Sequence, residues 1–201
     1  MPRAFSTLEK ENIRKALIQA AATGISKNGF RKLSIDYLVN KVHISKGAFY
    51  LFYSSKEMLI LDTLQHVQES ARKEIQTMIN RKTSDPHDDV ASRLLQGLFG
   101  VFTNYPIFAE LTKPDSLAEL IRGLPQEVLD KEFKSDEEFF RSFFVELVAK
   151  KQIRSIDLSV LCGLPRMVLA LEANKNMIGL DRYSELKEIF ISGMARQLKR
   201  R

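Results

Sequence analysis

The sequence predicts an all-α protein of about nine helices. An N-terminal three-helix domain carries a helix-turn-helix, and a larger C-terminal helical domain follows. Three observations predict this. Apolar residues recur at helical spacing along most of the chain, no run alternates as a strand would, and prolines and glycines punctuate the C-terminal part. The expected domain boundaries are residues 1–55 and 56–201.

The helices can be assigned in chain order. Residues 8–28 form a helix with one apolar side, which ends at the stop signal Asn28-Gly29. A long helix from Lys56 to about Arg81 ties the two domains together, and the polar segment 82–89 with its Asp85-Pro86 step is a loop. The remaining helical stretches are expected near residues 87–105, 106–113, 115–122, 125–151, 156–176 and 181–199.

Segment 34–56 indicates two short helices that meet at a tight turn. Ser34 precedes the apolar face of the first helix as an N-cap, and Ser45 can cap the second. The start of the second helix can lie against a phosphate backbone, because its opening residues are small or cationic. These residues are Lys46, Gly47 and Ala48.

Polar side chains follow on the same segment. Tyr50 and Tyr53 carry hydroxyl groups that can donate to phosphate. Lys56 opens the next helix behind a capping-box pattern from Ser54 to Glu57. The segment therefore predicts a surface that reads DNA.

These residues closely resemble the DNA-binding domain of the TetR family over about residues 8 to 61. The resemblance implies that Ser34, Tyr53 and Lys56 lie where that family often touches phosphates. It places these residues in the recognition helix: Ser45, Lys46, Gly47, Ala48 and Tyr50.

Three positions depart from the family pattern. His43 stands at the turn position where the family usually has glycine, which predicts a strained left-handed backbone there. Leu51 and Phe52 stand where tyrosine or histidine is common. We expect fewer polar contacts with DNA from these two positions.

The distribution of charge supports DNA binding independently. Residues 1–60 hold ten Lys or Arg and four Asp or Glu, whereas residues 61–201 hold twenty-one of each. The whole excess of +6 therefore lies in the part with the helix-turn-helix, as expected if that part meets a polyanion. The alternative reading of the charge alone is a solvated basic face.

Composition limits the class of protein. A hydrophobic fraction of 44% in 201 residues suits a soluble globular protein, and no apolar run has the length of a signal peptide or of a membrane span. We expect a cytoplasmic protein without membrane association. The single Cys162 allows no intramolecular disulfide, and its apolar surroundings favour an inert thiol over a redox sensor.

Eight of the thirteen phenylalanines lie between residues 99 and 144. Such a stripe is usually core, but pockets between bundled helices are also lined by aromatic side chains with a few polar groups. Arg166 invites an anionic ligand, with an exposed or dimer-rim arginine as the alternative. The candidate ligand-binding residues are Phe102, Asn104, Tyr105, Phe108, Phe140, Phe144 and Arg166.

The last two long helices offer wide apolar faces, with Gly163 and Gly193 as points of close approach. Resemblance to the TetR family implies a homodimer joined by these helices in a four-helix bundle. The alternative is that both faces are intramolecular core. The candidate interface residues are Leu164, Val168, Leu171, Leu186, Ile189, Phe190 and Met194.

The expected partners are a double-stranded DNA operator, a small-molecule effector and a second copy of the chain. The three histidines lack metal-ligand spacing and no glycine-rich phosphate loop occurs, so we expect no catalysis, metal or cofactor. By resemblance, the protein is a dimeric regulator, in the commoner mode a repressor, that an effector releases from a palindromic operator. The rival readings are a basic membrane-surface binding protein and an uncharacterised all-α enzyme.

Overall fold

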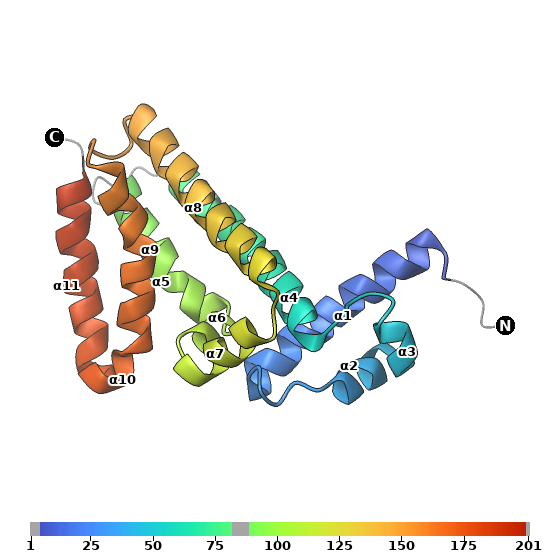
Figure 1. Ribbon diagram of the computed structural model, residues 1–201. Coiled ribbons are helices and arrows are strands. Elements are labelled where there is room, and N and C mark those ends of the chain that lie inside the picture. The colour runs from blue at the N-terminus through green and yellow to red at the C-terminus, as the bar shows by residue number, and fades with distance from the viewer. Residues whose placement is uncertain (1–4, 82–88, 200–201) are drawn as a thin grey trace. The chain divides into compact units, whose positions relative to one another are not determined.

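The computed structural model describes residues 5–81 and 89–199, and these residues form eleven helices and no strand (Figure 1). The all-α prediction is confirmed. Three helices, α3, α6 and α10, have only four residues each. The helices are α1 (Thr7–Asn28), α2 (Ile35–Val42), α3 (Lys46–Phe49), α4 (Lys56–Asn80), α5 (Val90–Asn104), α6 (Phe108–Leu111), α7 (Pro114–Arg122), α8 (Gln126–Ala149), α9 (Leu158–Ala173), α10 (Lys175–Ile178) and α11 (Leu180–Leu198).

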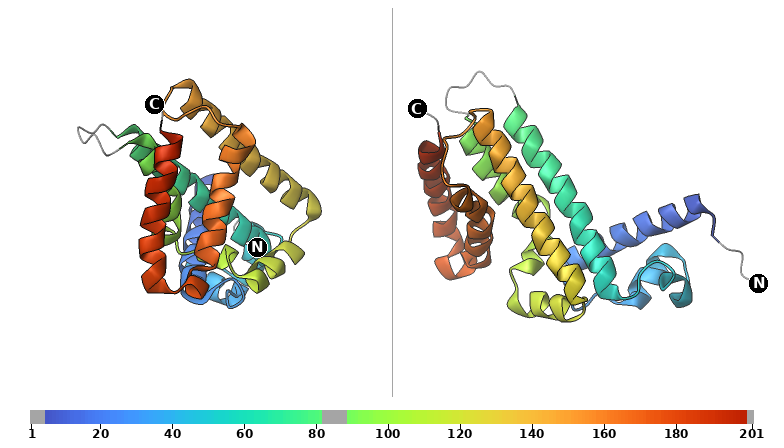
Figure 2. Two further views of the ribbon diagram at one scale, coloured as in Figure 1. Left: turned by 90° about the vertical axis from the view of Figure 1, so that its left-hand side faces the viewer. Right: turned by 45° about the horizontal axis from the view of Figure 1, so that its top comes forward.

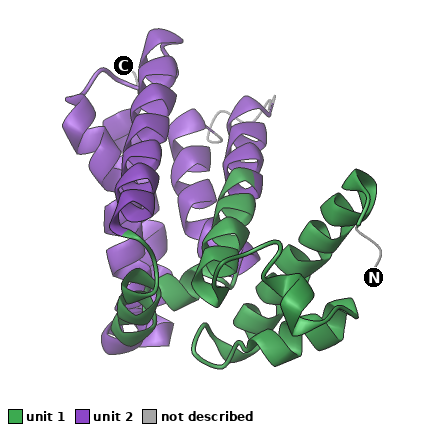
Figure 3. Ribbon diagram, turned by 45° about the vertical axis from the view of Figure 1, so that its right-hand side comes forward, with its two compact units in different colours: residues 1–69, 106–125 green, residues 70–105, 126–201 purple. Residues whose placement is uncertain are grey.

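The chain divides into two compact units, shown in separate colours in Figure 3. Unit 1 takes residues 1–69 together with 106–125, and unit 2 takes residues 70–105 and 126–201. Helix α4 contributes its first part to unit 1 and its second part to unit 2. The grouping of 106–125 with the N-terminal residues depends on long-range contacts, so it was not foreseen from the sequence.

Unit 1 is built on α1, whose ends the sequence specifies. At its start, the Glu9 N–H donates to Ser6 Oγ (3.3 Å) and the Ser6 N–H donates to Glu9 Oε2 (2.7 Å), which is a capping box. At its end, Gly29 has a positive φ of 80°, a conformation that favours glycine. Helix α1 packs against α2, and α2 packs against α3. The core of this part includes the buried side chains of Leu17, Ala21, Ile25, Leu38 and Phe49.

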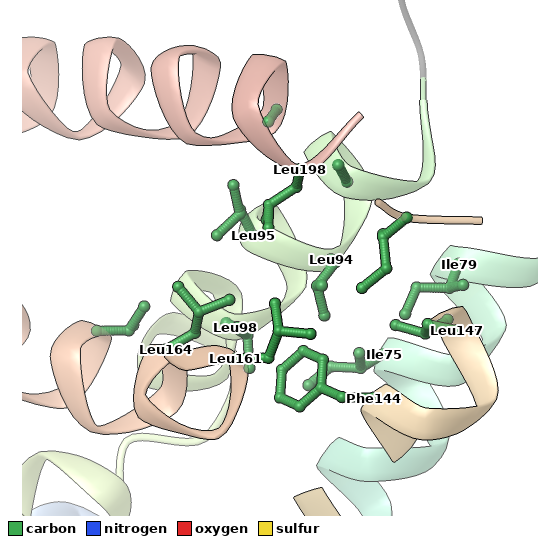
Figure 4. Packing of buried hydrophobic residues seen from close by; sticks show 14 of the residues in the cluster. Ile75, Ile79, Leu94, Leu95, Leu98, Phe144, Leu147, Leu161, Leu164 and Leu198 are labelled. Atoms are coloured by element: carbon green, nitrogen blue, oxygen red, sulfur yellow. The ribbon is translucent and has the colours of Figure 1, made fainter. Parts of the chain in front are cut away.

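Unit 2 is a helical bundle in which α5 packs against both α9 and α11, and α8 packs against α9. Helices α9 and α11 run side by side and α10 joins them at one end, as Figures 1 and 2 show. The ring of Phe144 is fully buried and lies among Ile75, Leu147 and Leu161 in Figure 4. Burying one such side chain stabilises a fold by about 1.5–3 kcal/mol.

Two further sequence expectations concern the loop after α4 and membrane-spanning helices. The expected loop 82–89 lies outside the described residues apart from Asp89, whose carboxylate caps α5 by accepting from the Ser92 N–H (2.8 Å). Within residues 5–81 and 89–199, no helix combines the length and the apolar character that crossing a membrane requires.

Candidate nucleic-acid interface

The turn between α2 and α3 has the geometry that the sequence predicted. His43 adopts a left-handed conformation (φ 58°, ψ 43°), and the following Ile44 N–H donates to the Val39 carbonyl (3.1 Å). This bond satisfies an end carbonyl of α2 in the manner of a Schellman motif. A histidine therefore occupies a position whose backbone suits glycine.

Both predicted N-caps are present. The Tyr37 N–H donates to Ser34 Oγ (3.1 Å), and the Ala48 N–H donates to Ser45 Oγ (3.1 Å). Both serines are exposed. Because each hydroxyl oxygen accepts the capping bond, its own proton remains able to donate to a phosphate oxygen.

The residues of α3 and the turn after it divide into two faces. Ala48, Phe49, Phe52 and Tyr53 are partly or fully buried. The opposite face is exposed and follows the i, i+1, i+4, i+5 spacing of one side of a helix. We call it the recognition stripe, and it consists of Lys46, Gly47, Tyr50 and Leu51.

Lys46 of the recognition stripe forms an ion pair with Asp36. Its Nζ lies 2.8 Å from Asp36 Oδ1 of α2, and this hydrogen bond raises the pKa of Lys46. Both side chains are more than half exposed, so the pair contributes little to stability in water. A phosphate oxygen can take the place of the Asp36 carboxylate as the partner of this ammonium group.

Tyr53 corrects the sequence prediction, because its hydroxyl is not free for phosphate. The side chain is buried, and its OH donates to Asp62 Oδ2 (2.5 Å). The guanidinium of Arg14 binds the same carboxylate oxygen through Nε (3.1 Å) and Nη2 (2.9 Å). Tyr53 therefore joins the segment after α3 to α1 and α4 within unit 1 and leaves the set of candidate DNA contacts.

The start of α4 also differs from the expectation. The Met58 N–H donates to Ser55 Oγ (3.2 Å), so the capping serine is Ser55 and not Ser54. The Lys56 side chain is only 19% exposed, and its Nζ lies 3.8 Å from Glu57 Oε1. Lys56 stays a candidate phosphate contact, but with little accessible surface.

Comparison with known proteins identifies the family of the helix-turn-helix. Residues 17–63 match the family model for bacterial regulatory proteins of the tetR family, a range that contains the whole helix-turn-helix. This segment is a DNA-binding domain of the tetR family. The family and its curated relatives are transcriptional regulators and not enzymes.

Three similar proteins show how far the likeness extends. An uncharacterized HTH-type transcriptional regulator, YdgC of Bacillus subtilis (strain 168), is 28% identical over 100 residues, which are 50% of this chain and 51% of YdgC. The structure of a TetR transcription regulator from Haloarcula marismortui ATCC 43049 has a TM-score of 0.68 against this fold. Its sequence is 17% identical, and the match covers 94% of this chain and 100% of that chain. RolR in complex with resorcinol has a TM-score of 0.61 and 18% identity over 98% of this chain and 92% of RolR.

The chain spans about half the length of the first of these curated relatives, 51% of YdgC. The two structural likenesses lie below 25% identity and concern the fold. Together they confirm the fold, a helix-turn-helix followed by a helical C-terminal part.

The candidate ligand residues of the regulator do not form one group. Phe108 belongs to unit 1, whereas Phe144 lies in the hydrophobic core of unit 2. Arg166 is exposed on α9, which agrees with the alternative reading and removes it from the anionic-pocket hypothesis. Phe102 and Phe140 are partly buried at the edge of the same core, so they stay candidates.

The two polar candidates share one partner. Asn104 Nδ2 donates to Glu74 Oε1 (2.6 Å), and the Tyr105 hydroxyl donates to Glu74 Oε2 (2.8 Å). Burial and this hydrogen bond raise the pKa of Tyr105. The sequence had not singled out Glu74, because it lies thirty residues earlier on α4.

The candidate interface residues differ in how far they are buried. Leu164 and Val168 are buried inside one chain, so they leave the proposed interface. Leu186 and Ile189 are 50% and 59% exposed. Leu171, Phe190 and Met194 are partly buried against the core of unit 2.

Proposed function

We propose that this protein is a homodimeric, ligand-responsive transcriptional repressor that binds a palindromic operator through the recognition stripe. The observation that carries the proposal is the stripe itself. Four neighbouring positions on the second helix of a helix-turn-helix and on the turn that continues it are exposed, while the opposite side is partly or fully buried. This is the arrangement with which such a helix enters the major groove.

The charge of the N-terminal part supports the same proposal. The formal excess of +6 lies within residues 1–60, which include the helix-turn-helix. Phosphate contacts supply much of the affinity of such proteins and hold the recognition helix in register. The exposed Ser34 and Ser45 hydroxyls and the Lys46 ammonium are the proposed phosphate contacts beside Tyr50.

A dimer supplies the two-fold symmetry that a palindrome needs. The proposed interface is the outer side of α9 and α11, where Leu186 and Ile189 are exposed. A Cβ added at Gly163 or Gly193 would meet no atom within 4 Å, so the partner's backbone can approach closely at both positions. Two recognition helices then reach successive major-groove faces about 34 Å apart.

Release by a small molecule requires a ligand that prefers a dimer state unfit for the operator. Helix α4 is continuous from unit 1 into unit 2, which makes it the proposed route between the effector and the helix-turn-helix. We propose an apolar or amphipathic effector beside Phe102 and Phe140 in unit 2, with Asn104 and Tyr105 as polar contacts. RolR, which shares the fold, binds resorcinol.

The test is selection of genomic fragments with purified protein. Wild type should enrich fragments that contain one palindrome, Tyr50→Ala should lose that enrichment, and Lys46→Ala should enrich the same palindrome more weakly because a phosphate contact is lost. Lys131→Ala is the matched control, because Lys131 is an exposed lysine on α8. Recovery of fragments in the proportions of the input, or binding to anionic vesicles without any preference among duplexes, would contradict the proposal.

A further inference from the structure

We propose that Leu51 reads the methyl group of a thymine in each half-site of the operator. The inference rests on the proposed function and names part of its sequence preference. Leu51 is 73% exposed, the largest exposed fraction among the large hydrophobic side chains of the described part of unit 1. It occupies one end of the recognition stripe, next to Tyr50.

The backbone places Leu51 on this face. The Leu51 N–H donates to the Ala48 carbonyl (3.1 Å) and the Tyr53 N–H donates to the Phe49 carbonyl (3.1 Å), so the helical turn of α3 continues past its last residue. Phe49 is fully buried and Tyr53 nearly so, which fixes the rotation of this turn. Leu51 consequently shares its side with Tyr50 and Lys46.

With 73% of it exposed, the Leu51 side chain contributes little to packing within unit 1. The next residue, Phe52, is partly buried, and the centroid of its ring lies 6.1 Å from that of Phe5. Single exposed leucines are ordinary on protein surfaces and need no function. What distinguishes Leu51 is its place on the recognition stripe, within the part of the chain that holds the whole excess of positive charge.

The chemistry of the major groove selects the partner. A leucine side chain neither donates nor accepts a hydrogen bond, so it gains nothing from the N7, O6, N6 or N4 groups of the bases. Among the four bases only thymine presents a methyl group in that groove, and apolar side chains are its usual contacts. The Lys46 ammonium of the stripe pairs with Asp36 and is the proposed phosphate contact, so an apolar contact from Leu51 adds discrimination between bases that Lys46 does not supply.

The test uses the operator duplex with single thymines replaced by deoxyuridine, which removes only the methyl group and keeps base pairing. For wild type we expect one position per half-site at which the replacement weakens binding about fourfold, the factor that corresponds to burying about one methyl group. Leu51→Ala should bind the thymine and deoxyuridine duplexes equally. Leu51→Met, which keeps an apolar tip, should retain the sensitivity.

Leu8→Ala is the matched control, because Leu8 is an exposed leucine of unit 1 that lies outside the recognition stripe. It should keep the full effect of the methyl group, whatever it does to overall affinity. Equal thermal unfolding of Leu51→Ala and wild type shows that the variant is folded, as expected for an exposed position.

The outcomes separate this inference from the proposed function. Tight, sequence-selective binding that no deoxyuridine changes would overturn thymine reading and leave the operator proposal standing. The same loss in Leu51→Ala as in wild type would assign the methyl contact to another residue and also overturn the inference. Absence of any preferred duplex would overturn the proposed function itself, and the inference with it.

Discussion

The carboxylate of Glu110 accepts a hydrogen bond from the backbone N–H of Phe30, at 3.3 Å from Glu110 Oε2. Glu110 belongs to α6, and Phe30 follows the glycine that ends α1. The carboxylate also accepts from Ser116 Oγ (3.2 Å) and forms an ion pair with Lys113. Glu110 is only 6% exposed, so this side chain fastens residues 106–125 to the end of α1 within unit 1.

We predict that Glu110→Ala lowers the free energy of unfolding by about 2–3 kcal/mol, because it leaves the buried Phe30 N–H and Ser116 hydroxyl without this acceptor. Urea unfolding measures the change. Glu119→Ala is the control on α7, since its ion pair with Arg31 (3.2 Å) is exposed and its loss should cost less than about 1 kcal/mol. Equal effects of the two substitutions would show that Glu110 does not hold this segment.

His43→Gly should stabilise the fold by about 0.5–1 kcal/mol, because glycine adopts the left-handed backbone of position 43 without the Cβ penalty. Thermal or urea unfolding of the two proteins gives the difference. Lys41→Gly in the last turn of α2 should instead destabilise by about 0.7 kcal/mol. A lower melting temperature for His43→Gly would mean that the histidine side chain stabilises this turn by more than its backbone strain costs.

The contrast between His43 and Glu110 shows what the sequence can predict. The left-handed turn at His43 and the caps at Ser34 and Ser45 follow from local patterns, so they were predicted correctly. Glu110 and Phe30 are eighty residues apart, and no local pattern signals their contact.

The same reason explains the errors within the candidate sites. Tyr53 has a hydroxyl that suits phosphate, but Asp62 and Arg14 engage it inside the fold. Leu164 and Val168 lie on an apolar face that sequence alone cannot divide between the core of one chain and a dimer interface. A capping serine one residue later than expected, Ser55, reflects the ordinary uncertainty of helix ends.

Tyr53 predicts a loss of stability at alkaline pH. Burial raises the pKa of Tyr53, and its hydrogen bond to Asp62 raises it further. The folded chain therefore keeps a proton that the unfolded chain releases near pH 10, so this contribution is complete below about pH 10 and is lost as the pH rises above it.

Urea unfolding at about pH 8 and about pH 11 tests this prediction. The free energy of unfolding should fall less between the two pH values in Tyr53→Phe than in wild type. Part of the fall should remain, because burial and a hydrogen bond to Glu172 also raise the pKa of Tyr183. An identical fall in both proteins would mean that the Tyr53 hydroxyl has the same proton affinity in the folded and unfolded chains.

Ile189→Lys should convert the proposed dimer to a monomer in sedimentation at micromolar concentration. The side chain is 59% exposed on α11, so the substitution leaves the fold of one chain intact and places a charge in the interface. Val145→Lys, at a half-exposed position on α8, should stay dimeric. A wild-type monomer at that concentration, or a dimeric Ile189→Lys, would place the interface elsewhere or remove it.

The salt dependence of operator affinity tests the central claim most directly. Fluorescence anisotropy at several salt concentrations should give a log–log slope that is smaller by about 0.9 in Lys46→Ala than in wild type, because one phosphate contact is lost. Lys131→Ala should keep the wild-type slope. If Lys46→Ala and Lys131→Ala have the same slope and affinity as wild type, Lys46 touches no DNA, and the recognition stripe is not the surface that binds the operator.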